Sequence, residues 1–225
     1  MSTRILAIDT ATEACSAALM LDDAVFLERF AVTPRTHTQS ILPMIDSLLA
    51  EAGITLDSLN ALAFSRGPGS FTGMRIGIGI AQGLAMGVDL PIISVSTLAA
   101  LAEGALRQTG ASKVLTAIDA RMGEVYWAAY QLKEGVWLGE DCEVVSAPAA
   151  LTALHADLTG SWATAGTGWE AYPSLLDHEG LELISGETLM PSARDMLPIA
   201  LHQYRHGNTQ RVEMAKLTYL RNKVL

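Results

Sequence analysis

The sequence predicts a two-lobed α/β protein in which one βββαβα unit occurs twice. The triplet Ala-Ile-Asp closes an apolar run at residues 7–9 and again at 117–119, and each time a short turn and a second apolar run follow. One shared triplet arises easily by chance, but the shared order of strand, terminal Asp, turn and strand indicates a duplication. We place the boundary near Gly110, which gives an N-terminal lobe over residues 1–109 and a C-terminal lobe over residues 110–225.

Three strands in a meander open the first unit. The apolar runs that predict them are residues 4–9, 15–21 and 24–32. Asp22-Asp23 supplies a tight turn between the last two runs. Pro34 stands at the entrance of the next segment, which predicts a helix because its apolar residues recur at helical spacing. Gly53 follows as a natural C-terminal cap.

Strands and helices alternate through the rest of the chain. In the first lobe we expect a strand at 60–65, a helix at 72–87, a strand at 91–95 and a helix at 96–109. In the second lobe we expect strands at 114–119, 124–131 and 162–166, a helix at 192–205 and a terminal segment at 212–225. The pattern is weaker beyond Ala147, so the order of elements there is less sharply defined.

Composition narrows the classes of function. Charged residues make up 17% of the chain, against roughly 25% in an average globular protein, and the mean hydropathy is +0.28. The deficit fits either a well-filled core or an apolar surface that another chain covers. The net charge of −9 opposes nucleic-acid binding by this chain alone, since phosphate contacts need clustered Lys and Arg.

The sequence predicts a soluble, cytoplasmic protein that does not contact membranes. Cys15 and Cys142 lie far apart with no metal-type spacing, as in a reduced cytosolic protein. The N-terminal apolar run is interrupted by charge too soon for a signal peptide. Asp89 divides the longest uncharged stretch, and neither part reaches the ~20 apolar residues of a membrane span.

The turn after the first strand resembles the first phosphate turn of the actin, Hsp70 and sugar-kinase superfold. In that superfold a strand-ending Asp precedes a turn with a central Gly, where backbone N–H groups meet phosphate. Here the central residue is Ala11, whose Cβ hinders such an approach. Asp9, Thr10 and Thr12 are therefore weak nucleotide-site candidates, and we favour a hairpin that keeps the fold without the ligand.

A glycine loop over residues 67–77 is the most specific stretch of the sequence. It lacks the spacing and the Lys of a Walker A loop, and it is not a dinucleotide fingerprint. Ser70 or Thr72 is placed to cap the following helix, and free N–H groups there could receive an anion, which makes both weak binding candidates. Five glycines recur along that helix: Gly73, Gly77, Gly79, Gly83 and Gly87. Each costs about 1 kcal/mol of helix propensity, so a neighbour must approach closely, either the helix's own sheet or a partner helix.

Histidine spacing offers little support for a metal site. His202 and His206 share one helix face, as zinc ligands would, but no acidic or Cys ligand stands beside them and Gly207 follows. A simpler explanation is that a His in the last helical turn, before a Gly cap, interacts favourably with the negative end of the helix dipole. His37 is expected to cap or pack at the start of the first helix.

Four segments closely resemble the TsaB (YeaZ) family over nearly the whole chain. They are residues 5–15 (ILAIDTATEAC), 67–77 (GPGSFTGMRIG), 117–127 (AIDARMGEVYW) and 166–169 (GTGW). The resemblance implies the duplicated actin/Hsp70/sugar-kinase-like (ASKHA) fold. It also implies a place in the bacterial machinery that makes threonylcarbamoyladenosine beside the anticodon of tRNAs. In that machinery TsaB is the partner of the catalytic TsaD, the ATPase TsaE joins them, and tRNA is reached only through the complex.

The same resemblance implies that this chain is not itself an enzyme. Where TsaD carries the metal-binding pattern V-N-H-L-x-x-H, Thr97 and Leu101 stand in place of the two His. Leu offers no lone pair to a metal. Alternatives are an ATP-dependent phosphotransferase of the same superfold, opposed by Ala11, and a metallopeptidase-like enzyme, opposed by the missing His pair. Residues 214–222 lack the Pro that usually precedes Y-L-R-N in the family, so Tyr219 and Arg221 are given no role.

The first two helices are predicted to form a docking face for TsaD and, when no partner is present, for a homodimer that excludes TsaD. The first helix has more apolar residues than a narrow stripe on a sheet requires. The alternative is that all of these residues pack on the chain's own sheet. We expect no cofactor of the chain's own, while a nucleotide could lie at the subunit junction. The predicted interface consists of Ile41, Leu42, Met44, Ile45, Leu48, Leu49, Gly73, Gly77, Ile80, Gly83 and Leu84.

Overall fold

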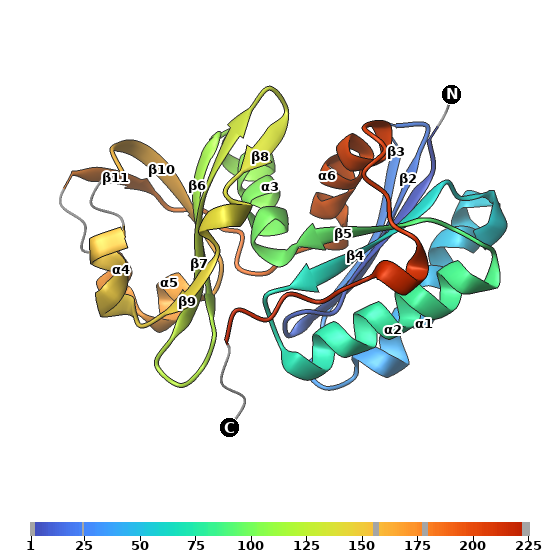
Figure 1. Ribbon diagram of the computed structural model, residues 1–225, viewed down its shortest axis with the longest axis horizontal. Coiled ribbons are helices and arrows are strands. Elements are labelled where there is room, and N and C mark those ends of the chain that lie inside the picture. Colours follow the sequence, from blue (N-terminus) through green and yellow to red (C-terminus); the bar gives the residue numbers. More distant parts are fainter. Residues whose placement is uncertain (1–2, 24, 155–157, 177–179, 222–225) are drawn as a thin grey trace.

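Two β-sheets, one from each half of the chain, stand side by side in the computed structural model (Figure 1). The structure describes residues 3–23, 25–154, 158–176 and 180–221. The first sheet contains β1 (Ile5–Asp9), β2 (Ala14–Leu21), β3 (Val25–Val32), β4 (Ala61–Gly67) and β5 (Ile92–Ser96). The second contains β6 (Lys113–Asp119), β7 (Val125–Lys133), β8 (Val136–Leu138), β9 (Val144–Ser146), β10 (Gly160–Ala165) and β11 (Leu181–Ile184).

The two sheets repeat one topology. The strand order is β3-β2-β1-β4-β5 in the first sheet and β8-β7-β6-β10-β11 in the second, with β9 added on β7. In the first sheet β1 pairs antiparallel with β2 and parallel with β4. In the second sheet β6 pairs in the same way, antiparallel with β7 and parallel with β10. The duplicated α/β fold predicted from the repeated Ala-Ile-Asp triplet is confirmed.

Six helices cover the sheets in the described part of the chain. They are α1 (His37–Ala52), α2 (Phe71–Gly87), α3 (Thr97–Thr109), α4 (Pro148–Leu154), α5 (Gly168–Ala171) and α6 (Ala193–Arg205). Short 3₁₀ turns lie at Leu56–Ser58, Glu140–Cys142, Pro173–Leu176 and Val212–Met214. Helix α1 ends at Gly53, whose φ of 64° confirms the predicted left-handed cap. Ser70 and Ser96 cap α2 and α3 through their hydroxyl groups.

The central strands β1 and β2 of the first sheet are buried on both faces because they are apolar at nearly every position. Leu6 and Ile8 of β1 face α1 and α2, whereas Ile5 and Ala7 face α6. Figure 1 shows α6 on one side of this sheet and α1 with α2 on the other. The second sheet packs one face against α3, and its other face lies toward α4 and α5.

The last helix of each half belongs to the other half's sheet. Helix α3 packs mainly against β6 and β10 of the second sheet, and α6 packs against β1, β2, β4 and β5 of the first. The strands within residues 1–109 form the first sheet and those within residues 110–225 form the second, whereas α3 and α6 each pack mainly on the sheet of the other half. An amphipathic pattern shows that a helix buries one face, but it does not show against which sheet.

After α6 the chain returns along the first lobe and then crosses to the second. Gln210 bridges to Ile92 at the edge of β5, and Gln82 of α2 donates from Nε2 to the carbonyl of Val212 at 3.3 Å. Further on, the N–H of Thr218 donates to the carbonyl of Arg66 at 2.8 Å. Figure 1 shows this last segment passing beside α2 toward the space between the lobes.

None of the helices in the described residues is both long and apolar enough to cross a bilayer.

Candidate functional site

Asp9, at the end of β1, is a buried carboxyl group turned toward its own backbone. Its Oδ1 accepts hydrogen bonds from the N–H of Ala11 at 2.7 Å and from the hydroxyl of Ser65 at 2.8 Å. Burial outweighs these hydrogen bonds and raises the pKa of Asp9 to about 6. Its Oδ2 is buried and has no hydrogen-bond partner among the described residues.

The first turn is closed from outside by α2. The hydroxyl of Thr10 donates to the carbonyl of Gly73 at 2.8 Å, and the N–H of Ser70 donates to the carbonyl of Ala11 at 2.7 Å. A Cβ added at Gly73 would lie 2.1 Å from the carbonyl oxygen of Thr10. At Gly77 it would lie 2.7 Å from the Thr10 hydroxyl. These two glycines therefore allow α2 to approach its own lobe, which corrects their prediction as partner contacts.

The turn consequently does not fit a phosphate group in the way that the superfold uses it. The N–H of Ala11 is already donated to Asp9, and the carbonyl of Ala11 is covered by Ser70. Thr12 accepts from the N–H of Ala14 at 3.2 Å, so it also serves the turn itself. His37 packs below, where its Nε2 lies 2.9 Å from the carbonyl of Thr12 and acts as donor. The predicted packing role of His37 is confirmed.

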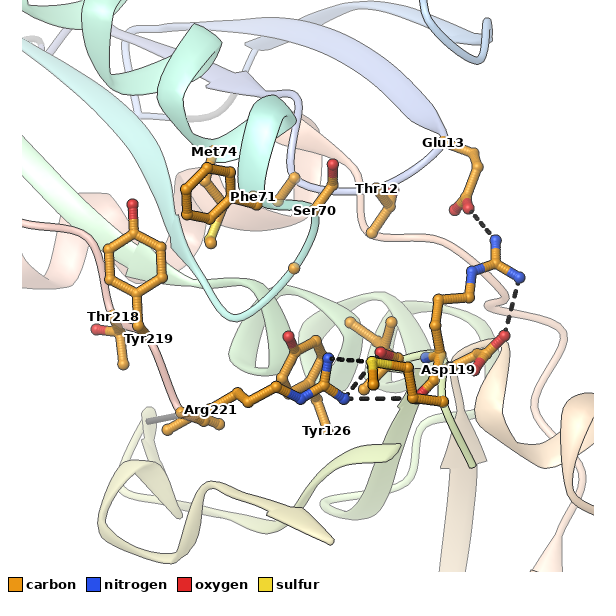
Figure 2. A pocket seen from close by; sticks show the side chains of 17 residues that line it. Thr12, Glu13, Ser70, Phe71, Met74, Asp119, Tyr126, Thr218, Tyr219 and Arg221 are labelled. Carbon is orange, nitrogen blue, oxygen red and sulfur yellow. Dashed lines mark hydrogen bonds and ion pairs between the residues drawn. The ribbon is translucent and has the colours of Figure 1, made fainter. Parts of the chain in front are cut away.

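A cavity of about 480 Å³ lies between the lobes beside this turn. Its walls come from three places: the first turn with the start of α2, the turn between β6 and β7, and the C-terminal segment. Figure 2 shows Thr12 and Ser70 on one side and Tyr126 with Arg221 on another. Of the five weak binding candidates, Thr12 and Ser70 line the cavity, Asp9 and Thr10 lie behind its wall, and Thr72 is exposed outside it.

Both guanidinium groups in the cavity wall are already paired with carboxylates. Arg121 of the second lobe lies 2.7 Å from Glu13 of the first lobe and 3.1 Å from Asp119 (Figure 2). Arg221 forms an ion pair with Glu124 and donates to the carbonyl of Ala120 at 3.1 Å. Neither cation is thus free to receive a phosphate group, and three carboxylates stand close by.

The turn between β6 and β7 was not identified from the sequence as a structural device. Arg121, Met122 and Gly123 have φ values of 61°, 59° and 78°. The first two are not glycine, so the conformation needs outside support. Arg221 supplies it by donating to the turn's carbonyl groups, a role that the tail sequence did not reveal.

The positions that would carry metal ligands in the resembling enzyme are occupied by a buried Leu and a buried Thr. Leu101 is fully buried in the core of α3 and the second sheet, and Thr97 is buried at the start of α3. His202 and His206 stack at 4.1 Å between ring centroids, and Nδ1 of His206 donates to the carbonyl of His202 at 2.8 Å. Within the described residues, no group of three His, Cys, Asp or Glu side chains is arranged to hold a metal ion.

The predicted docking residues other than the glycines divide into three sets. Ile41, Ile45 and Leu48 are at most 2% exposed and pack on the first sheet, so their prediction as interface residues was wrong. Leu42, by contrast, is 45% exposed. Four others are partly buried: Met44, Leu49, Ile80 and Leu84. Some of the apolar side chains of α1 thus face the sheet and others face outward. That a residue is apolar does not show which of the two directions its side chain takes.

Gly83 belongs to an outward row of glycines on α2. A Cβ added at Gly79, Gly83 or Gly87 would meet no atom within 4 Å among the described residues. These positions are four residues apart and so lie on one face of the helix. The glycines of α2 therefore serve two faces: Gly73 and Gly77 allow the inward contact, and the other three leave the outward backbone uncovered.

Comparisons with known proteins agree with this architecture. The family model described as "TsaD: tRNA N6-adenosine threonylcarbamoyltransferase" matches residues 31–158. An Escherichia coli K12 protein named "tRNA threonylcarbamoyladenosine biosynthesis protein TsaB" is 57% identical, covering 98% of this chain and 96% of its own. YeaZ from Pseudomonas aeruginosa has a TM-score of 0.85 at 42% identity, covering 97% of this chain and all of that one.

A more distant match shows the fold alone. Component A of the (R)-2-hydroxyglutaryl-CoA dehydratase of Acidaminococcus fermentans has a TM-score of 0.50 at 10% identity, over 92% of this chain and 99% of its own. The two-lobed ASKHA fold class is thereby confirmed. From the extent and identity of the matches to the two bacterial relatives, the chain belongs to the TsaB (YeaZ) family of tRNA threonylcarbamoyladenosine biosynthesis proteins.

Proposed function

We propose that this chain is the non-catalytic subunit of the cytoplasmic complex that adds the threonylcarbamoyl group to adenosine beside the anticodon of tRNAs. In this proposal it docks on the catalytic subunit TsaD and makes it competent, while the ATPase TsaE joins the two. The observation that carries the non-catalytic role is the closed first turn, where Thr10 and Ala11 are bonded to the start of α2.

Two features support the absence of an activity of its own. The N–H of Ala11 is bonded to Asp9 and is not available to a phosphate, and the start of α2 packs directly against the turn. Leu101 is an apolar core residue at a position where the resembling enzyme carries a metal ligand. The isolated chain should therefore show no ATPase, kinase or peptidase turnover and require no cofactor. ATP hydrolysis that disappears in Asp9→Ala would overturn this expectation.

The outward surface of α1 and α2 supports the docking role. Leu42 exposes an apolar side chain on α1, and the row of Gly79, Gly83 and Gly87 leaves the backbone of α2 accessible to a close helix. In the absence of TsaD, the same surface would pair with a second copy of the chain, so that the homodimer and the complex with TsaD exclude each other. A nucleotide, if one is needed, would lie at the junction of the subunits. Transfer RNA would be contacted only through the complex.

Reconstitution tests this function. Modification of tRNA by TsaD and TsaE, with the enzyme that supplies the threonylcarbamoyl group, is measured with this chain omitted, present, or changed to Leu42→Asp. Leu138→Asp is the matched control, because Leu138 lies on β8 of the other lobe and is 48% exposed, against 45% for Leu42. Omission and Leu42→Asp should both abolish modification, whereas the control should not. Equal modification without the chain would refute the proposal.

A further inference from the structure

We propose that Arg75 is a preorganised anchor for one carboxylate of the protein that docks on α2, an inference that rests on the proposed docking function. Arg75 is the single charged residue among the seventeen residues of α2. It is exposed, and the described residues offer it no ion pair within 4 Å. By contrast, most of the other described arginines pair with a carboxylate of the chain itself.

The guanidinium group of Arg75 is held in place by aromatic and backbone contacts. Its Cζ lies 3.2 Å from the ring centroid of Phe71 and 5.4 Å from that of Tyr219. Its Nη1 also donates to the carbonyl of Phe71 at 3.3 Å. These contacts fix the side chain but leave it without a counter-charge. A cation fixed in this way loses less conformational entropy on pairing than a free one.

Tyr219 reaches this site from the far end of the sequence. The N–H of Thr218 is bonded to the carbonyl of Arg66, and Arg221 is bonded to the second lobe, so both neighbours fix the position of Tyr219. Its ring lies 6.0 Å from that of Phe71, between centroids. Figure 2 shows the two rings close together on the α2 side of the cavity. The C-terminal segment thus has a defined task, which is to complete the support of Arg75.

Arg75 is continuous with the outward row of glycines. Phe71, Arg75, Gly79, Gly83 and Gly87 are successively four residues apart, so they form one row along the helix. A helix lying on the three glycines would extend past Arg75 at close range. Docking would therefore remove water from the only charge on α2.

This burial dictates the chemistry of the partner. An unpaired guanidinium group buried in an interface is strongly destabilising, whereas a paired and hydrogen-bonded one is tolerated. The planar guanidinium group matches a carboxylate through two parallel hydrogen bonds. The docking surface that fits α2 is hence an apolar helix with an Asp or Glu at the end that faces Arg75. A phosphate of tRNA is opposed by the chain's net charge of −9.

Calorimetric titration with TsaD from the same bacterium tests the inference. The variants are Arg75→Glu and Arg75→Gln, and the matched control is Lys133→Glu, which makes the same charge reversal at an exposed position of the second lobe. Arg75→Glu should weaken binding by about 100-fold and Arg75→Gln by about tenfold, while Lys133→Glu stays within about twofold of wild type. Replacing the partner's anchoring carboxylate by Lys should restore binding to Arg75→Glu. Circular dichroism confirms folding of each variant.

The outcomes separate this inference from the function on which it rests. If wild type binds TsaD and Arg75→Glu binds equally well, or if Lys133→Glu is weakened as much, the anchor is refuted but docking stands. If tRNA binding by this chain is lost in Arg75→Glu while TsaD binding is kept, the anchor serves a phosphate and the inference is wrong. If wild type does not bind TsaD at all, the proposed function fails and the anchor fails with it.

Discussion

Arg66 at the end of β4 forms an ion pair with Glu143, which precedes β9 in the second lobe, at 3.3 Å between Nη2 and Oε2. The two side chains are only 13% and 3% exposed. Glu143 also accepts hydrogen bonds from the hydroxyl groups of Ser96 and Tyr130, the latter at 2.6 Å. Because donors from both lobes converge on one buried carboxylate, this group fixes how the lobes are oriented.

Replacing Arg66 by Met should destabilise the fold strongly, because it leaves Glu143 buried without its cation. We expect the free energy of unfolding to fall by about 3–5 kcal/mol. Arg29→Met is the control, since Arg29 pairs with Glu51 at the surface, where loss of a pair costs less than about 1 kcal/mol. Urea denaturation measures both. Equal losses in the two variants would show that the lobes are not held by this pair.

Asp9 should make stability depend on pH. Burial raises its pKa from 3.8 to about 6. Between those values the folded chain holds a proton that the unfolded chain has released, so the free energy of unfolding falls as pH rises from about 4 to about 6. The total change is up to about 3 kcal/mol. Asp9→Asn keeps an acceptor for Ala11 and Ser65 and should lose this dependence. Denaturation at several pH values measures the difference between variant and wild type. A difference that is constant with pH would contradict the assignment.

The sequence was sufficient for local structure because the relevant signals are local. The apolar runs, the Asp22-Asp23 turn and the Gly53 cap each act within a few residues, and each predicted strand and helix lies within a few positions of its expected bounds. The elements β8, β9, β11, α4 and α5 of the second half were not predicted, because they are short and their apolar pattern is weak. The exchange of α3 and α6 between lobes is a tertiary property, and helical periodicity contains no information about it.

The candidate site was predictable only in part, for the same reason. The sequence showed five glycines in α2 but could not show that Gly73 and Gly77 contact Thr10 while Gly79, Gly83 and Gly87 face outward. Both sets have a four-residue spacing, and only the position of the first turn distinguishes them. Similarly, Glu13 of the first turn pairs with Arg121, and Arg221 of the C-terminal segment pairs with Glu124. Each pair joins residues about a hundred positions apart, so the sequence pattern could not reveal it.

Arg221 should stabilise the turn between β6 and β7 locally. It donates to Glu124 at 2.9 Å through Nε and to the carbonyl of Ala120 at 3.1 Å through Nη2. Hydrogen bonds to charged groups contribute about 1.5–3 kcal/mol, so Arg221→Ala should increase amide exchange in residues 119–124 by about tenfold or more. Arg211→Ala, which removes a well-exposed pair with Glu213, is the control and should leave these amides unchanged. Unchanged exchange in Arg221→Ala would show that the turn supports itself.

Leucine at Gly77 and at Gly83 should produce opposite defects, although both are glycines of one helix. At Gly77 even a Cβ would lie 2.7 Å from the hydroxyl of Thr10, so Gly77→Leu must displace α2 from the first turn at a cost of about 1–3 kcal/mol or more. At Gly83 the added side chain enters open space, and the loss of a helical glycine favours the helix by up to about 1 kcal/mol. Gly83→Leu should therefore fold at least as stably as wild type.

Partner binding should follow the reverse order. An isobutyl group at Gly83 would hold an approaching helix away from the α2 backbone, so Gly83→Leu should lose binding to TsaD and also self-association, which sedimentation velocity detects. Gly77→Leu should lose binding only to the extent that it unfolds, which thermal denaturation on the same samples measures. If Gly83→Leu is folded and keeps both assemblies, no helix packs on the outward glycines, and the docking surface must lie away from α2.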